Sequence, residues 1–127
     1  MSWKPELEEI ERRAKLAQQM GGEERVGRAR AAGRLTVRER IDRLLDPGSF
    51  HETGVLAGRT EYDADGRLAS FTPSNFVCGT GRIDGRRVVV GGDDFTVRGG
   101  SAEAAIGNKM GWAEKAAFDL RLPLVRL

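Results

Sequence analysis

One stretch of this chain combines flexible backbone, a hydroxyl group and acidic side chains at a predicted change of secondary structure. It reads DFTVRGGSAE and spans residues 94–103. We expect an apolar strand over residues 95–97 to run into Gly99 and Gly100, with a helix starting at Ser101. Helix starts leave N–H groups unpaired, and glycines admit a ligand close to the main chain because they carry no Cβ. The junction could therefore hold an acyl or phosphate oxygen.

A tight turn followed by a helix cap, with nothing bound, would explain the same residues. Glycine and serine commonly punctuate structure, and Glu103 in the first turn of the helix would suit a capped start at Ser101. The residues alone leave both interpretations open. Lys109, two turns along the expected helix, could reach a CoA phosphate, although lysines on helix surfaces are usually only solvated.

Two further patterns resemble sites but lack an essential part. Gly79, Gly81 and Gly85 resemble a dinucleotide-binding fingerprint, but position 84 is aspartate and a hairpin follows in place of a helix. Adjacent carboxylates at positions 93 and 94 would point apart in a strand or turn, which favours turn and cap roles. His51 and Cys78 have no visible catalytic partner, so we expect both to be structural.

An arginine-rich run could instead form a nucleic-acid-binding surface. Acidic residues are interspersed in it, no aromatic residue offers a base-stacking platform, and no Lys/Arg face is free of acids. These features favour a solvated or subunit-facing surface, and we expect no nucleic acid partner. The arginines are Arg25, Arg28, Arg30, Arg34, Arg38, Arg40 and Arg43.

Two motifs together resemble a known family. The first is the 94–103 junction, which Val88, Val89 and Val90 precede; the second reads GRLTVRERIDRLLDPGSF at residues 33–50. Their order and separation are similar to those in the carboxyltransferase subunit of biotin-dependent acyl-CoA carboxylases, of the propionyl-CoA and methylcrotonyl-CoA type. The resemblance runs from about residue 23 to the last residue. It departs at positions 98 and 102, where this chain has Arg and Ala and the family commonly has Phe and Leu.

The resemblance implies a crotonase-type (ClpP/crotonase-like) α/β fold, of which this chain would carry the leading helices and the first ββα unit. The complete subunit would transfer a carboxyl group from carboxybiotin to the α-carbon of an acyl-CoA. Biotin would be carried by a biotin carboxylase/biotin carboxyl carrier partner, and the carboxyltransferase subunits would form a homo-oligomer. The implied acyl-CoA contacts are Phe95, Gly99, Gly100, Ser101 and Lys109, with no catalytic residue and no metal in this chain.

Two alternatives stay open at this point. The same family includes biotin-dependent acyl-CoA decarboxylases, which these residues do not separate from carboxylases. A chain of this length could also be a non-catalytic assembly or binding module that pairs with other subunits.

Composition limits the class of protein. The 127 residues are 39% hydrophobic and 31% charged, with a net charge of +2, as in a globular domain without a general affinity for anionic surfaces. One cysteine and one histidine provide neither a disulfide framework nor a zinc site. The sequence contains no apolar run of the roughly 20 residues needed to cross a bilayer and no signal-peptide core, so we expect a cytoplasmic protein without membrane contacts.

Three segments follow from the local patterns. Apolar residues at helical spacing predict an amphipathic helix within residues 1–22, and residues 23–34 are expected to be an Arg/Gly-rich, poorly packed connector. Residues 35–127 would begin the carboxyltransferase domain. There, Thr36 and Glu39 predict a capping box for a second helix that Asp46 and Pro47 end.

The remaining elements are mostly strands. Residues 51–56 predict a short strand, and an Asp-Gly pair at 84–85 predicts a hairpin between residues 76–83 and 86–90. Apolar residues at intervals of four and three then predict a helix through to about residue 119. Residues 122–127 read as a buried strand that ends without a turn, so we expect the chain to be a piece of a longer subunit.

Overall fold

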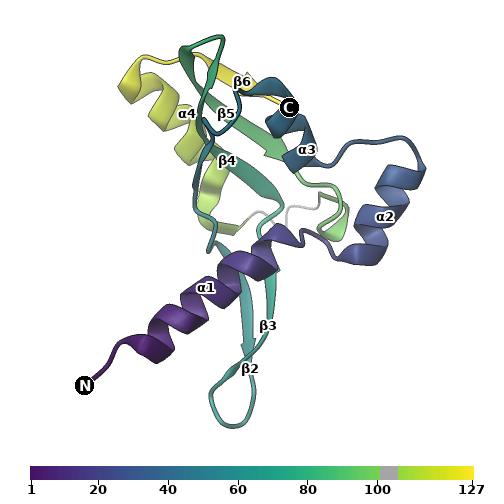
Figure 1. Cartoon of the computed structure of the whole chain (residues 1–127), viewed down its shortest axis with the longest axis vertical. Coiled ribbons are helices and arrows are strands. Elements are labelled where there is room, and N and C mark those ends of the chain that lie inside the picture. Colours follow the sequence, from purple (N-terminus) through teal and green to yellow (C-terminus); the bar gives the residue numbers. More distant parts are fainter. Residues whose placement is uncertain (101–105) are drawn as a thin grey trace.

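A four-stranded sheet organises the computed structural model, which describes residues 1–100 and 106–127 (Figure 1). The sheet order is β1 (His51–Thr53), β4 (Phe76–Ile83), β5 (Arg86–Asp93) and β6 (Leu124–Arg126). β1 and β5 pair with β4 in antiparallel fashion, and β6 pairs with β5 in parallel. The predicted hairpin is therefore confirmed, and a strand is present within residues 122–127. That strand is not buried as expected, because Leu124 and Arg126 are exposed.

Helices cover both faces of the central hairpin. On one face, Val77, Val88 and Val90 pack with Val37 and Ile41 of α3 (Val37–Leu44). On the other face, the side chains of Phe76, Cys78 and Val89 pack with Ala113 and Ala117 of α4 (Lys109–Leu120). Burial on both faces explains why the strands read as continuous apolar runs and not as alternating ones.

Two local predictions about turns and caps are confirmed. The Thr36 hydroxyl accepts from the N–H of Glu39 at 3.2 Å, and the Glu39 carboxylate accepts from the N–H of Thr36 at 2.8 Å, which completes the capping box of α3. Asp84 and Gly85 both have positive φ angles, 49° and 79°, as a tight hairpin turn requires. The carboxylate of Asp46 accepts from both of their N–H groups.

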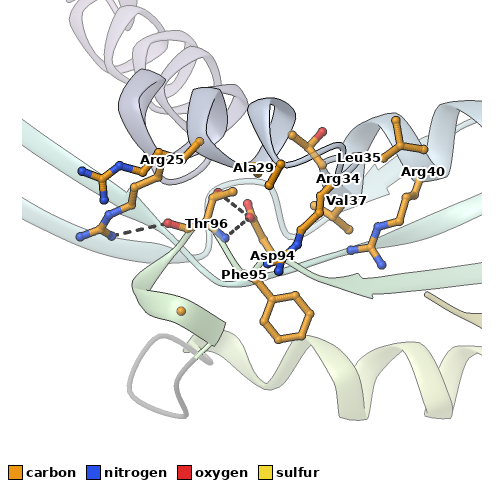
Figure 2. Close-up of a pocket in the computed structure, with 13 residues that line it drawn as sticks. Arg25, Ala29, Arg34, Leu35, Val37, Arg40, Asp94, Phe95 and Thr96 are labelled. Atoms are coloured by element: carbon orange, nitrogen blue, oxygen red, sulfur yellow. Dashed lines mark hydrogen bonds between the residues drawn. The ribbon is translucent and has the colours of Figure 1, made fainter.

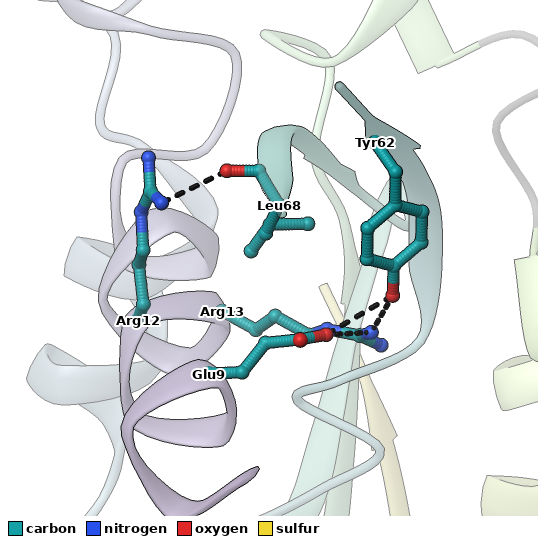
Figure 3. A network of polar contacts seen from close by, with 5 residues as sticks. All are labelled: Glu9, Arg12, Arg13, Tyr62 and Leu68. Atoms are coloured by element: carbon teal, nitrogen blue, oxygen red, sulfur yellow. Dashed lines mark hydrogen bonds and ion pairs between the residues drawn. The ribbon is translucent and has the colours of Figure 1, made fainter. Parts of the chain in front are cut away.

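The first helix lies beside a second, two-stranded sheet. This helix, α1 (Lys4–Gln18), runs along the hairpin of β2 (Gly58–Tyr62) and β3 (Leu68–Pro73) (Figure 1). Figure 3 shows the polar contacts that join them. Arg12 donates to the Leu68 carbonyl oxygen at 2.8 Å, and the Glu9 carboxylate accepts from Tyr62 and from Arg13. The loop at the tip of this hairpin, residues 63–67, is exposed.

The expected connector at residues 23–34 is mostly helical, and that expectation is corrected. α2 (Glu23–Ala31) is a surface helix in which only Val26 is buried. Acidic residues in its first turn and arginines in its last turn complement the helix dipole, and Glu24 pairs with Arg28 one turn later. Residues 23–31 therefore form a helix because most of them are good helix formers and their charges suit the helix dipole. The apolar periodicity that usually predicts a helix is missing from this segment.

Two further expectations differ at the junction. Residues 95–97 form a turn and not a strand, because β5 continues to Asp93 and the chain then curls into a 3-10 turn, η1 (Arg98–Gly100). The expected helix start at Ser101, with Glu103, lies outside the described residues. A second 3-10 turn, η3 (Ile106–Asn108), contains a left-handed Gly107, and regular α-helix begins only at Lys109. Of the residues that we expected on the apolar stripe of this helix, Ala113 and Ala117 are buried.

The connection between α1 and α2, residues 19–22, is called the elbow here. It is hydrogen-bonded to the turn that follows β5. The Gly21 N–H donates to the Thr96 hydroxyl at 2.9 Å. A Cβ on Gly21 would overlap the Thr96 carbonyl group, so only glycine fits there. Among the described residues, none of the helices combines the length and apolar character that crossing a membrane requires.

Gly21→Ala should lower the free energy of unfolding by about 3 kcal/mol, because the new methyl group must displace backbone and not a flexible side chain. Gly27→Ala is the matched control: Gly27 lies inside α2 with open space around it, so alanine there should stabilise by about 0.5–1 kcal/mol. Urea unfolding of both variants measures the difference. Equal effects of the two substitutions would show that the elbow is not packed as described.

Candidate functional site

A buried aspartate shapes the turn that follows β5. The Asp94 side chain is 2% exposed, and its Oδ1 accepts from the Thr96 N–H at 3.0 Å and from the Thr96 hydroxyl at 2.5 Å. The Asp94 N–H donates to the Asn75 carbonyl oxygen at 2.7 Å, and its own carbonyl oxygen accepts from the Val97 N–H at 3.2 Å. Asp94 therefore has the turn role that we expected.

The backbone after this turn is left-handed at three successive residues. The φ angles are 46° at Arg98, 62° at Gly99 and 75° at Gly100. Glycine adopts this region without the steric cost that Arg98 bears, so the backbone conformation favours glycine at positions 99 and 100. The N–H of Gly100 donates to the Val97 carbonyl oxygen at 3.0 Å, whereas the N–H of Gly99 has no acceptor within the described part of the chain.

The two glycines differ in what surrounds them. A Cβ at Gly100 would lie 2.8 Å from Cδ1 of Phe95, so the Phe95 ring packs directly against this glycine. A Cβ at Gly99 would meet no atom of the described residues within 4 Å. Among these residues, Gly99 thus presents bare backbone to open space, as a ligand contact would require.

A pocket of about 660 Å³ lies between α2, the start of α3 and this turn (Figure 2). Phe95 and Gly99 line it, so the structure brings together two of the residues that the sequence predicted as acyl-CoA contacts. Apolar and arginine side chains both line it, and among the described residues its lining contains one carboxylate, that of Asp94. The other lining residues are Arg25, Arg28, Ala29, Ala32, Arg34, Leu35, Thr36, Val37, Arg40 and Thr96.

Of the other predicted site residues, Ser101 lies outside the described residues and Lys109 lies away from this pocket. Lys109 is 7% exposed, and its aliphatic stem packs beneath Gly54, where a Cβ would lie 3.3 Å from the lysine Cε. Burial lowers the pKa of Lys109, and the nearby Cys78 and Glu52 oppose that shift. The structure therefore does not place Lys109 with the glycine turn.

The surroundings of Lys109 are polar and tightly packed. Arg38 forms two parallel hydrogen bonds to the Glu52 carboxylate, at 2.8 and 2.9 Å, with both side chains largely buried. The Cys78 sulfur lies 3.8 Å from the Thr53 carbonyl oxygen and 3.7 Å from that of Lys109, so its one S–H can donate to either, and burial raises the pKa of Cys78. A protonated, hydrogen-bonded thiol agrees with the structural role that we expected for this cysteine. Within the described part of the chain, no three His, Cys, Asp or Glu residues are grouped so that they could hold a metal ion.

Sequence reasoning missed the part that α2 and the start of α3 play in this pocket. The arginines were known from the sequence, but a connector without structure could not present Arg25 and Arg28 on one wall. The acidic first turn and arginine-rich last turn of α2 were the signal that could have identified the helix.

Comparison with known proteins gives one consistent result. The family described as "Carboxyl transferase domain" matches residues 28–127. The mitochondrial propionyl-CoA carboxylase beta chain of Homo sapiens is 36% identical over 122 residues, which are 94% of this chain and 23% of that protein. The propionyl-CoA carboxylase beta chain of Cereibacter sphaeroides is 40% identical over 124 residues, or 95% of this chain and 24% of that protein. This chain thus spans about a quarter of the length of these curated relatives.

Two solved structures of related proteins are also similar to this chain. The transcarboxylase 12S structure with methylmalonyl-coenzyme A and methylmalonic acid bound has a TM-score of 0.79 and 32% identity, over 99% of this chain and 25% of that one. A single-chain, multi-domain long-chain acyl-CoA carboxylase has a TM-score of 0.72 and 28% identity, over 96% of this chain and 14% of that one. These likenesses confirm the predicted crotonase-like α/β fold.

Lys109→Met should increase stability near pH 7 relative to the parent, because burial disfavours the protonated amine. The folded-state pKa lies below the ordinary value of 10.5, so the unfolded chain binds more protons between the two values. Parent stability therefore rises with pH through that window, and the advantage of the methionine variant should shrink there. Urea unfolding near pH 7 and pH 10 measures the gap.

Lys115→Met, which removes an exposed lysine from the same helix, is the matched control. A gap between parent and Lys109→Met that is the same at both pH values would contradict a buried, destabilised ammonium group.

Proposed function

The chain belongs to the carboxyl transferase domain family, and from this we propose that it forms the N-terminal part of an acyl-CoA carboxyltransferase subunit. The complete subunit would transfer a carboxyl group to the α-carbon of an acyl-CoA. Carboxybiotin on a partner carrier protein would supply that carboxyl group. The subunits would act as a homo-oligomer, as those of transcarboxylase 12S assemble into a hexamer.

The observation that carries the proposal is the left-handed turn at the edge of the pocket. Carboxyl transfer to the α-carbon of a thioester passes through an enolate, whose oxygen needs fixed hydrogen-bond donors. Among the described residues, the N–H of Gly99 has no acceptor, and a Cβ on Gly99 would meet no atom within 4 Å. We assign Phe95, Gly99 and Gly100 to acyl-CoA contact, together with Ser101 from the sequence.

The rest of the turn keeps this donor in place. Asp94 and Thr96 hold the backbone that leads to the glycines, and the Phe95 ring closes over Gly100. A preorganised donor costs no rearrangement when charge develops on the substrate oxygen. We assign no residue of this chain to biotin.

Carboxyl transfer can be tested in the reverse direction. The full-length natural polypeptide that carries this chain should carboxylate free biotin with methylmalonyl-CoA or malonyl-CoA as the donor, at a rate that depends on acyl-CoA concentration. Failure with a panel of carboxyacyl-CoA donors would overturn the proposal. Release of CO₂ without carboxybiotin formation would show a decarboxylation that does not use biotin, and would also contradict the proposal.

Gly99→Ala should lower kcat/KM for acyl-CoA about tenfold or more in that polypeptide, because a methyl group would stand between the backbone donor and the thioester. The substitution should also lower stability by about 1–2 kcal/mol, since alanine is forced into a left-handed conformation. Steady-state kinetics at saturating biotin, with a melting curve for each variant, measure both effects.

Gly66→Ala separates the two causes. Gly66 has a φ of 75° and open space around it, but it lies at the tip of the β2–β3 hairpin and away from the pocket. It should show the same loss of stability with unchanged kinetics. If the two variants have equal activity, Gly99 does not contact the substrate.

A further inference from the structure

A second pocket, of about 360 Å³, lies on the four-stranded sheet beside the turn of the β4–β5 hairpin. Two arginines, a histidine and two hydroxyl residues line it together with two glycines, and no described residue that lines it is acidic. The lining residues are Gly48, Ser49, His51, Thr80, Gly81, Arg82 and Arg87. We call this the hairpin pocket.

The strand register places the polar side chains of the hairpin pocket on one face of the sheet. Arg82 of β4 lies directly opposite Arg87 of β5, in a ladder without register shifts. His51 of β1 lies directly opposite Thr80, which is two residues from Arg82 along β4. Because side chains in a strand alternate between the faces, these four project from the same face. The Ser49 hydroxyl accepts from the Arg82 N–H at 3.1 Å, so its own O–H can donate to a ligand.

The two arginines of the hairpin pocket have no acid beside them. Like charges directly opposite each other on neighbouring strands are destabilising. Within the described part of the chain, neither Arg82 nor Arg87 forms an ion pair, and neither does His51. The carboxylate of Asp46 accepts from the N–H groups of the hairpin turn instead. The cross-strand arginine pair thus has an unfavourable charge that a bound anion would neutralise.

The donors of the hairpin pocket suit a compact oxyanion. Each guanidinium group offers parallel N–H donors that match two oxygens of a phosphate, and the hydroxyls and the imidazole can add single donors. All five polar side chains are exposed or half-buried, so a ligand can reach them. Their convergence in about 360 Å³ fits one small anion better than an extended acidic peptide.

We propose that the hairpin pocket binds a phosphate-type oxyanion, either inorganic phosphate or the phosphate group of a small phosphomonoester. Arg82 and Arg87 bind the anion from two neighbouring strands, and Ser49, Thr80 and His51 donate to its remaining oxygens. The bound anion removes the repulsion between the two arginines. It also connects β1 to the hairpin, so it stabilises the folded protein.

The hairpin pocket is independent of the acyl-CoA contacts proposed above. Arg87 and Asp93 lie near opposite ends of β5, about 20 Å apart at the usual rise of a strand. No described lining residue is shared with the pocket beside Gly99. Anion binding can therefore be tested whether or not carboxyl transfer is found.

The test uses the full-length natural polypeptide and its Arg82→Gln and Arg87→Gln variants. Calorimetric titration with inorganic phosphate, at an ionic strength held constant with chloride and with CoA present throughout, measures binding at sites that CoA does not occupy. Each variant should bind phosphate about tenfold more weakly than the parent, because charge-assisted hydrogen bonds are lost. Arg86→Gln removes the same charge from the next residue, which is exposed but projects from the other face of the sheet, and should bind phosphate like the parent.

Melting curves give a second readout that does not depend on calorimetry. Without phosphate, the two pocket variants should melt at or above the temperature of the parent, because one of two facing charges has been removed. Added phosphate should raise the melting temperature of the parent and of Arg86→Gln, and raise that of the pocket variants much less.

Glycerol 3-phosphate distinguishes the two sources of the anion. Binding of this ester that is lost in the pocket variants would assign the site to a phosphorylated small molecule, whereas binding of inorganic phosphate alone would assign it to the free ion. No binding of either ligand by the parent at millimolar concentration would overturn the proposal. Equal phosphate affinity in the parent and both pocket variants, or an equal loss in Arg86→Gln, would also overturn it.

Discussion

The arrangement of this molecule depends on the hydrogen bonds of one buried carboxylate. Asp94 joins the end of β5 to Asn75 through its N–H and holds Thr96 through its side chain. Thr96 in turn accepts from the N–H of Gly21, which lies 75 residues earlier in the chain. A buried carboxylate without such donors would be strongly destabilising, so these hydrogen bonds favour the observed turn. That geometry brings the α1–α2 elbow against the sheet edge.

The pocket follows from this connection. One wall comes from α2 and the start of α3, and the other comes from the turn after β5, so neither segment forms it alone. The sheet supplies a rigid base because both of its faces are packed, by α3 and by α4. On that base, the left-handed backbone of residues 98–100 exposes a peptide N–H that a regular strand would have used in pairing. Rigid support and exposed backbone are what oxyanion stabilisation requires.

Sequence reasoning succeeded where short-range contacts decide the structure. The capping box of Thr36 with Glu39 and the Asp84–Gly85 turn each need only neighbouring residues, and both are present. It was wrong at residues 95–97, because the strand pattern of Phe95 to Val97 is overridden by the buried carboxylate of Asp94. The family motif pointed to Phe95 and Gly99, but the arginine wall could not be foreseen without α2. The burial of Lys109 depends on β1, which the local pattern around the lysine does not contain.

Hydrogen–deuterium exchange of the full-length natural polypeptide, with and without a saturating acyl-CoA, tests the central claim most directly. A ligand seated between α2 and the turn after β5 should slow exchange in two separate segments at once, residues 25–36 and 95–100, and leave the β2–β3 hairpin unchanged. We therefore expect slower amide exchange in both segments when acyl-CoA is bound. Acyl-CoA binding that leaves both segments unchanged and protects other parts of the polypeptide would contradict it.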